Sequence, residues 1–410
     1  MELIDMNDAL MTIDDLDVVG RRVLLRADFN VPLDRSDPDG AARVADDTRI
    51  RAALETIEEL RLRGGRLVLA SHLGRPKGPD PAFSMRPVAD RLAELTGWPV
   101  TLAPAVVGPR VLELTERLTP GEMLMLENVR FEPGETKNAP ELAAALAELA
   151  DAYVNDAFGT AHRAHASTEG VAHLLPSAAG RLMERELREL RAIVERPERP
   201  LVAILGGAKL SDKIGVVERF LDLADVLCIG GAMAFPFLAA QGHSVGSSLC
   251  PEGDLEPARR ALDKAASSRC RLALPLDLRL ADEPGGGSAT RTLEGVDVPD
   301  GWAGLDIGPR TAERYAAEIA AAGTVFWNGP MGRFELEPFA GGTGAVAHAL
   351  ASSHATTVVG GGETVEAMRS LSLEGCVTHL STGGGATLEL LEGRELPGVQ
   401  ALLRSPVEAR

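Results

Sequence analysis

Short apolar runs alternate with amphipathic segments of helix length through most of this 410-residue chain. Runs such as 201–205 and 324–327 are long enough for buried strands, and segments such as 47–62 and 213–223 space their apolar residues as a helix does. Strands separated by helices pair in parallel, and helices then cover both faces of the sheet. The other predicted strands are 23–25, 67–70, 123–126, 152–154, 226–229, 272–274, 357–359 and 377–380, and the other predicted helices are 139–149, 181–195 and 311–322.

The length of the chain and one break in the pattern predict its domains. A chain of 410 residues is too long for one typical core, so we expect two to three domains. The charged segment 181–195 is followed at 196–200 by two prolines, which end a helix. We therefore expect an α/β protein with a domain boundary near this segment. We expect the Pro/Gly-rich stretch 282–287 to be a surface loop.

The net charge and the cysteines exclude several classes of protein. A formal charge of −18 opposes general binding to nucleic acids or anionic membranes, which need a positive field. No run of about 18 apolar residues is present, and residues 1–5 lack the basic and apolar regions of a signal peptide. None of the four cysteines lies at C-x-x-C spacing. We therefore expect a cytoplasmic protein with reduced, metal-free thiols that binds neither nucleic acid nor membrane.

The residues after the predicted strands differ between the two halves of the chain. In the first half the strands run into polar segments such as 26–30, 71–75 and 155–158. In the second half they run into glycine-rich turns such as 206–207 and 360–362. Ligands bind outside the carboxyl ends of the strands in open α/β sheets. The sequence thus predicts recognition by side chains in the first half and by backbone groups in the second.

Arginines near the strand ends of the first half indicate an anion site. Guanidinium groups suit carboxylate and phosphate oxygens, so several at one sheet edge would hold a small, highly anionic molecule. The alternative for each arginine is a solvated surface charge, and it is weakest for Arg75 and Arg163, which lie inside histidine-containing motifs. The residues are Arg49, Arg75, Arg130 and Arg163, with His72, His162 and His165 close by in sequence.

Two lysines follow the apolar run 201–205. They are Lys209 and Lys213, two of only five lysines among 42 basic residues. Lysine is a compact point charge on a flexible stem, which suits a moving phosphoryl group better than the planar fork of arginine does. The alternative is that both face solvent on a helix, as pairs at this spacing often do.

Glycine-rich turns that lead into helices indicate a phosphate site in the second half. The segments 360–364 and 381–391 each expose backbone N–H groups at a helix start, where the dipole also attracts anions. Glu363 could carry magnesium, a hard cation that prefers carboxylate and phosphate oxygens. The alternative is that these glycines only form tight turns, and neither of the two commonest nucleotide-binding loops follows a strand. From the residues alone we predict a phosphoryl transferase with an anion-binding domain and a nucleotide-binding domain.

Several segments together closely resemble the phosphoglycerate kinase family. The resemblance runs in order from about residue 5 to residue 402, and several segments are long enough to exclude chance. The segments are 26–32 (RADFNVP), 72–76 (HLGRP), 127–131 (ENVRF), 155–165 (NDAFGTAHRAH), 206–213 (GGAKLSDK), 304–309 (GLDIGP), 327–332 (WNGPMG) and 381–393.

The resemblance implies the reversible reaction of 1,3-bisphosphoglycerate and MgADP to 3-phosphoglycerate and MgATP, by direct in-line transfer after hinge closure. It implies two Rossmann-like domains: an N-terminal 3-phosphoglycerate-binding domain at 1–185 and a C-terminal nucleotide-binding domain at 186–395. A segment at 396–410 would return to the first domain. Mg²⁺ is the implied cofactor, with ATP or ADP as co-substrate, and a monomer is the expectation.

The resemblance also implies roles for individual residues. Asp28, Phe29 and Asn30 would bind the glycerate, and Arg49 would reach its carboxyl end. The distant phosphate would be held by His72, Arg75, Arg130 and Arg163. The nucleotide would be bound by Lys213, Gly304, Asn328, Glu335, Gly361, Gly362, Glu363 and Thr364, with Glu363 also the metal ligand. Arg49, Lys209 and the backbone of Gly383, Gly384 and Gly385 would neutralise the transferred phosphoryl group. Glu186 and His379 would form a contact between the domains.

Three residues depart from the family pattern on the nucleotide side. Glu363 stands where the family usually has aspartate, Ala232 replaces a usual glycine, and Arg333 replaces a small apolar residue. The guanidinium of Arg333 could stack on the purine or obstruct it. Two alternatives to an active ATP-dependent kinase therefore stay open: a relative that binds ligands without turnover, and a kinase that accepts another purine nucleotide such as GDP.

Overall fold

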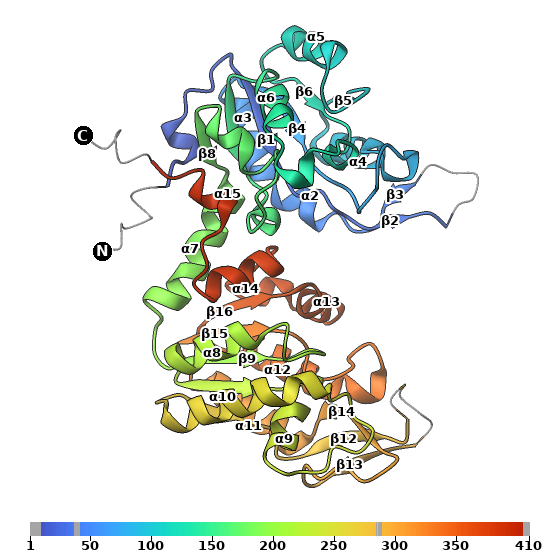
Figure 1. The fold of residues 1–410 in the computed structure, drawn as a ribbon, viewed down its shortest axis with the longest axis vertical. Helices are drawn as coiled ribbons and strands as arrows, with labels where there is room; N and C mark the ends of the chain where they lie inside the picture. The colour runs from blue at the N-terminus through green and yellow to red at the C-terminus, as the bar shows by residue number, and fades with distance from the viewer. Residues whose placement is uncertain (1–9, 37–41, 284, 286–288, 405–410) are drawn as a thin grey trace. The chain divides into compact units, whose positions relative to one another are not determined.

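The computed structural model describes residues 10–36, 42–283, 285 and 289–404 and divides into two compact units (Figure 1). Unit 1 holds the described residues up to Arg188 and those from Glu395 onward, and unit 2 holds Glu189–Arg394. The division falls within helix α7 (Arg181–Glu195). The predicted domains 1–185, 186–395 and 396–410 were assigned to particular ligands, and these assignments stay predictions. Residues 1–5, and residues 284, 286 and 287 of the predicted loop at 282–287, lie outside the described residues.

Unit 1 is built on a six-stranded parallel sheet in the order β5-β6-β4-β1-β7-β8. Its central strands are almost wholly buried because helices pack on both faces, as a parallel sheet requires. The strands are β1 (Arg22–Arg26), β4 (Arg66–Ala70), β5 (Val100–Leu102), β6 (Met123–Met125), β7 (Ala152–Asn155) and β8 (Ser177–Ala179), and β2 (Leu33–Asp34) pairs with β3 (Arg43–Val44) beside them. The helices are α2 (Thr48–Ala52), α3 (Leu54–Leu62), α4 (Arg86–Thr96), α5 (Pro109–Arg117) and α6 (Pro140–Ala147).

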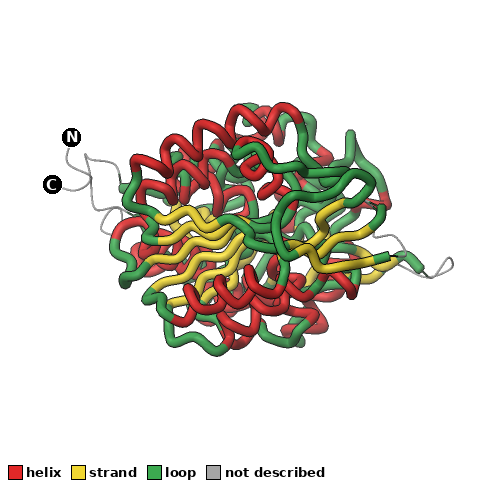
Figure 2. Tube along the Cα trace, turned by 90° about the horizontal axis from the view of Figure 1, so that it is seen from below, coloured by secondary structure: helices red, strands yellow, loops and turns green. Residues whose placement is uncertain are grey.

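Unit 2 repeats this plan with a sheet in the order β11-β10-β9-β15-β16-β17. Figure 2 shows its strands between layers of helices. The strands are β9 (Leu201–Leu205), β10 (Val226–Ile229), β11 (Arg271–Ala273), β15 (Thr324–Asn328), β16 (Thr356–Gly360) and β17 (His379–Leu380). The helices are α8 (Ile214–Leu223), α9 (Phe235–Ala240), α10 (Leu255–Ser267), α11 (Pro309–Ala320), α12 (Gly341–Ala351), α13 (Gly362–Ser370) and α14 (Gly385–Leu391).

A small antiparallel sheet in unit 2 has its own core. Its order is β13-β12-β14, and the strands are β12 (Leu278–Ala281), β13 (Thr290–Leu293) and β14 (Ala303–Ile307). Leu278, Leu280 and Val298 pack there against Phe235 and Leu238. The sequence did not predict these strands, because the apolar run of β14 is broken by a glycine and an aspartate and the two central residues of β13 are exposed.

The predicted fold class is confirmed: both main sheets are parallel and lie between helices. The predicted helix 47–62 is two helices that meet at Ala53, and the predicted strand 377–380 is shortened to β17. The segment from Glu395 joins unit 1, where Gly398 N–H donates to Ala161 O at 2.9 Å and Met11 N–H to Leu402 O at 3.0 Å. Within the described part of the chain, no helix is long and apolar enough to cross a membrane.

Candidate functional site

The segments after β1 and β4 meet at one edge of the unit 1 sheet because these strands are parallel neighbours. Asp28 Oδ2 lies 2.9 Å from Arg49 Nη1 there. Burial alone would raise the pKa of Asp28, but the positive charges around it, Arg49 foremost, together with the hydrogen bond from Asn30 N–H outweigh burial, and the pKa falls below its ordinary value. The site therefore presents an ionised carboxylate, a hydrogen-bond acceptor, beside a fixed cation.

His72 lies behind this pair, and its side chain is buried. Burial lowers the pKa of its imidazole well below its usual range, so the ring is neutral at pH 7. Its Nδ1 lies 3.2 Å from the guanidinium of Arg26, which is itself fully buried. His72 does not line the cavity that the other predicted phosphate-binding residues share.

Arg26 joins this edge to a second buried group. Its Nε donates to Ser167 Oγ at 2.9 Å, and Ser167 Oγ donates to Glu135 Oε1 at 2.6 Å. Glu135 is 1 % exposed, and its Oε1 lies 3.6 Å from His165 Nδ1. Sequence reasoning assigned no role to Arg26 or Glu135. The available signal for Arg26 was a charged residue directly after the apolar run 23–25.

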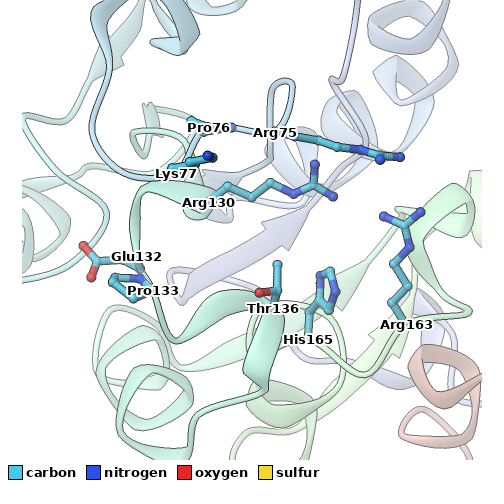
Figure 3. Close-up of a pocket in the computed structure, with 9 residues that line it drawn as sticks. All are labelled: Arg75, Pro76, Lys77, Arg130, Glu132, Pro133, Thr136, Arg163 and His165. Carbon is cyan, nitrogen blue, oxygen red and sulfur yellow. The ribbon is translucent and has the colours of Figure 1, made fainter.

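Three of the predicted arginines line one open cavity of about 600 Å³ (Figure 3). The guanidinium groups of Arg75, Arg130 and Arg163 point toward a common region from three separate segments. Lys77 and His165 also line the cavity. Partial burial lowers the pKa of Arg130, and the neighbouring positive charges, Arg163 foremost, lower it further. Like charges held this close favour a bound dianion, so the cavity suits a phosphate group.

A buried amide holds two of the contributing segments together. Asn128 Nδ2 donates to Leu73 O at 2.7 Å, while Asn128 Oδ1 accepts from the N–H groups of Leu73 and Arg130 at 3.2 and 3.1 Å. The guanidinium of Arg130 donates to Gly74 O. Asn30 Oδ1 accepts from Gly74 N–H at 2.7 Å, which leaves the amide nitrogen of Asn30 as its ligand donor. The phosphate cavity and the glycerate residues are thus parts of one framework.

Phe29 and Arg163 differ in whether their side chains face the site. The ring of Phe29 is fully buried in the core, and its N–H donates to Ser71 Oγ at 2.8 Å, so its side chain does not face the site. Arg163 Nε donates to His162 Nε2 at 3.0 Å and keeps the rest of its fork toward the cavity.

In unit 2 the carboxyl ends of β9 and β15 meet around Lys213. Its Nζ donates to Gly206 O at 2.7 Å and to Asn328 O at 3.1 Å. Burial lowers the pKa of Lys213 to about 8, while the negative charge of Glu363 acts in the opposite direction. The ammonium is therefore fixed at the end of the sheet, and it releases its proton at a lower pH than an exposed lysine does.

The glycines here permit close backbone approach. A Cβ on Gly206 would lie 2.1 Å from Pro330 O, and one on Gly231 would lie 2.6 Å from Gly207 N. Within the described residues, Asn328 Nδ2 is buried without a hydrogen-bond partner. An orphaned buried donor is rare, and it points to a ligand atom that completes it.

The predicted turn residues divide into exposed and structural ones. Gly361 has a φ of +91° and precedes α13, so the exposed Gly362 and Glu363 present the first turn of a helix. Thr364 is buried and its Oγ1 accepts from Gly329 N–H at 2.7 Å, which ties α13 to the turn after β15. Gly384, with a φ of +54°, precedes α14, and Gly383 N–H donates to Ser381 Oγ at 3.2 Å.

The remaining predicted nucleotide residues lie around β14 and the loop after β9. Gly304 is buried against the ring of Phe235, where a Cβ would lie 2.4 Å from Cζ. Glu335 and Lys209 are exposed, as is Arg333, whose N–H donates to Leu305 O at 2.9 Å. The backbone of Ala232 does not adopt a positive φ, so alanine is tolerated there without strain. Glu186 and His379 are both buried, and their mutual contact stays a prediction.

The acidic residues of unit 2 suit a metal that a substrate shares. Among the described residues, no group of three His, Cys, Asp or Glu side chains converges as a complete metal cage. Mg²⁺ usually takes one or two carboxylates and completes its octahedron with phosphate oxygens and water. An exposed carboxylate at Glu363, beside the helix start that would receive phosphates, fits that arrangement.

Comparison with known proteins places this geometry in a family. Residues 13–394 match the family model described as phosphoglycerate kinase. The chain is similar to the phosphoglycerate kinase of Rubrobacter xylanophilus, with 55% identity over 392 residues that cover 95% of this chain and 97% of that protein. It is also similar to that of Chloroflexus aurantiacus, with 52% identity over 397 residues, 95% of this chain and 98% of the relative. A solved structure of phosphoglycerate kinase from Coxiella burnetii is 40% identical, with a TM-score of 0.85 and coverage of 96% of this chain and 98% of that one.

Proposed function

The chain belongs to the phosphoglycerate kinase family, and we propose that units 1 and 2 divide the substrates of its reaction between them. The chain is a kinase that transfers a phosphoryl group reversibly between 1,3-bisphosphoglycerate with ADP and 3-phosphoglycerate with ATP. The observation that carries the division is the cavity in unit 1 toward which Arg75, Arg130 and Arg163 converge. It supports binding of the phosphate that is not transferred.

The glycerate lies beside this cavity in our proposal. Its phosphate pairs with the three guanidinium groups, and Asp28 accepts a hydrogen bond from its hydroxyl group. The amide nitrogen of Asn30 donates to it, and Arg49 reaches its carboxyl end. This assignment is supported by the ionised state of Asp28 and by the framework that holds Asn30 next to the loop of Arg75.

The nucleotide phosphates bind at the carboxyl edge of the unit 2 sheet. Lys213, the orphaned amide nitrogen of Asn328 and the N–H groups of Gly361 and Gly362 supply donors to them. Gly304 lies in the wall of the purine site, and Glu335 accepts from the ribose hydroxyls. The support is that Lys213 and Asn328 are buried donors at the strand ends where ligands of α/β sheets bind.

Phosphoryl transfer itself needs no covalent enzyme intermediate. A carboxylate oxygen of 3-phosphoglycerate attacks the γ-phosphorus of ATP in line, the new O–P bond forms, and the bond from phosphorus to the bridging oxygen of ADP breaks. No proton moves, because the attacking carboxylate is already ionised. The protein supplies position and positive charge, which we assign to Arg49, Lys209 and the N–H groups of Gly383 and Gly384, the first of which would exchange Ser381 Oγ for a phosphoryl oxygen. The two substrates must meet for direct transfer, which we assign to closure of the units.

Mg²⁺, when bound with the nucleotide, neutralises the phosphate oxygens. We propose that Glu363 holds it together with those oxygens. Removal of Mg²⁺ with EDTA should abolish turnover, and Glu363→Ala should raise the Mg²⁺ concentration needed for half-maximal rate by about tenfold. Glu363→Asp should behave like the unchanged protein. An unchanged Mg²⁺ dependence in Glu363→Ala would assign the metal to another carboxylate.

The proposed function is tested by steady-state phosphorylation of 3-phosphoglycerate by MgATP, coupled to consumption of the acyl phosphate. We expect turnover in the usual kinase range of about 1–100 s⁻¹. Lys209→Ala should lose about 10²–10³ in kcat. Lys264→Ala is the matched control, since Lys264 pairs with Asp222 at 2.8 Å on an exposed helix face of the same unit and should change nothing.

Two outcomes would favour the alternatives. Absence of turnover in folded protein that still binds 3-phosphoglycerate would indicate a relative that no longer catalyses the reaction. Equal or faster turnover with GDP than with ADP would show that Arg333 and Ala232 have changed the purine preference. We further propose a cytoplasmic monomer, which sedimentation equilibrium of the full chain would test.

A further inference from the structure

A second open cavity, of about 460 Å³, lies in unit 2 and is lined by none of the residues assigned above to a substrate. Its walls come from α11, from the first half of α12, from β12 and β13, and from the end of β14. This volume falls in the range of about 300–1,000 Å³ that small-molecule sites occupy. The cavity is therefore large enough for a compact organic ligand and separate from the proposed nucleotide residues.

Small apolar side chains create the space. Ala312 and Ala316 of α11 and Ala345 of α12 line it, together with Pro309 and Ile307. Larger residues at the alanine positions would close the gap between the two helices. The lining therefore favours the flat or compact apolar part of a ligand over a hydrated one.

One wall of the cavity holds a rigid carboxyl group. Asp306 is 5 % exposed, and it accepts from Gly342 N–H at 2.7 Å and from Ile307 N–H at 2.9 Å. Gly342 permits this close approach, since a Cβ there would lie 2.3 Å from Asp306 Oδ1. Burial raises the pKa of Asp306 to about 7.

The cavity also contains a cation, Arg279, whose charge acts on the Asp306 carboxyl group from beyond ion-pair distance. Arg279 donates to Thr290 Oγ1 at 2.8 Å and to Thr292 Oγ1 at 3.3 Å, both neutral groups. In the part of unit 2 that the structure describes, no carboxylate oxygen lies within ion-pair distance of its guanidinium. Two hydroxyl groups orient the guanidinium without neutralising it, so an anionic ligand group would find a positioned partner.

We propose that this cavity binds a small amphiphilic monoanion, whose apolar body packs on the alanines of α11 and α12 and whose single carboxylate or sulfonate pairs with Arg279. Polyanions such as nucleotides are disfavoured, because the carboxyl groups of Asp306 and Glu313 line the same cavity. The proposal does not depend on the substrates assigned above. It adds a binding site on the kinase for a different class of ligand.

The test uses the full chain and the fluorescent probe 1-anilinonaphthalene-8-sulfonate, compared with N-phenyl-1-naphthylamine, which lacks the sulfonate. Arg279→Met should weaken binding of the sulfonate about tenfold or more and leave the uncharged probe almost unchanged. Ala316→Trp, which fills the cavity, should abolish binding of both. Saturating MgADP should displace neither probe.

The matched control is Arg291→Met. Arg291 lies on the same three-stranded sheet, stacks over Trp302 at 4.1 Å and does not line the cavity, so its loss should not change binding of the sulfonate. Equal effects of Arg279→Met and Arg291→Met would overturn the proposal, as would displacement by MgADP. If Ala316→Trp fails to fold, the proposal is still tested by comparing how Arg279→Met and Arg291→Met bind the sulfonate probe and the uncharged probe.

Discussion

Lys213 should make the stability of unit 2 depend on pH above neutrality. Its pKa falls from an ordinary 10.5 to about 8 because the ammonium is buried. Between these pH values the unfolded chain keeps the proton that the folded chain has released, so the free energy of unfolding rises with pH. Since one pKa unit is worth 1.36 kcal/mol, the rise attributable to Lys213 is about 3 kcal/mol between pH 8 and pH 10.5.

The assay compares urea unfolding of the unchanged protein with that of Lys213→Met at several pH values from 7.5 to 10.5. Of the three tryptophans, Trp98 lies in unit 1, and Trp302 and Trp327 lie in unit 2. Both proteins therefore carry Trp98→Phe, so that tryptophan fluorescence follows the unfolding of unit 2. The comparison with Lys213→Met is needed because burial raises the pKa of the Cys228 thiol, which lowers stability over the same pH range.

We expect the difference in unfolding free energy between the two proteins to rise by about 3 kcal/mol across that range. The loss of donors to Gly206 O and Asn328 O in the variant is independent of pH and cancels in this slope. Lys264→Met, at a partly exposed lysine, should reproduce the slope of the unchanged protein. A flat or falling difference would refute the reasoning, because it would mean that Lys213 is not desolvated in the folded state.

Three further predictions concern single residues. Arg163→Met should raise the KM for 3-phosphoglycerate by about 10- to 100-fold in steady-state assays. The control Arg117→Met, at an exposed ion pair, should leave the KM unchanged. Equal KM values in the two variants would show that Arg163 is not part of the site. The stability of the unchanged protein relative to Asp306→Asn should fall by roughly 4 kcal/mol as pH rises from about 4 to about 7. The reason is that the carboxyl group of Asp306 releases its proton near pH 3.8 in the unfolded chain and near pH 7 in the folded chain. Urea unfolding of both proteins measures this, and a difference in unfolding free energy that stays constant with pH would contradict it. Gly206→Ala should lower the unfolding free energy by about 2 kcal/mol or more, since its methyl group would lie 2.1 Å from Pro330 O, whereas Gly253→Ala, with open space, should stay near zero.

The sequence was a good guide to the elements that bury one continuous apolar run. The run 201–205 predicts β9 residue for residue, because five consecutive apolar residues fit a strand covered on both faces. The sequence was a poor guide to strands that are only partly buried. The strand β13 exposes its two central residues and takes its register from β12, so its own pattern carries little information.

The candidate site shows the same division. Arg75 and Arg163 were predicted from motifs that combine histidine, glycine and arginine, and both line the cavity of unit 1. Arg26 and Glu135 were missed, although Ser167 links them by hydrogen bonds in the structure. They lie more than a hundred positions apart, and no local pattern relates residues at that separation.

What the sequence determined by itself is the kind of each element and the chemistry available at its end, since both depend on neighbours a few residues away. The alternation of strands and helices, the arginines after the first strands and the glycines after the later ones are all local properties. Tertiary structure decided which ends meet and in what electrostatic state. The neutral His72, the ionised Asp28 and the weakened base Lys213 follow from burial and from charges that only folding brings together.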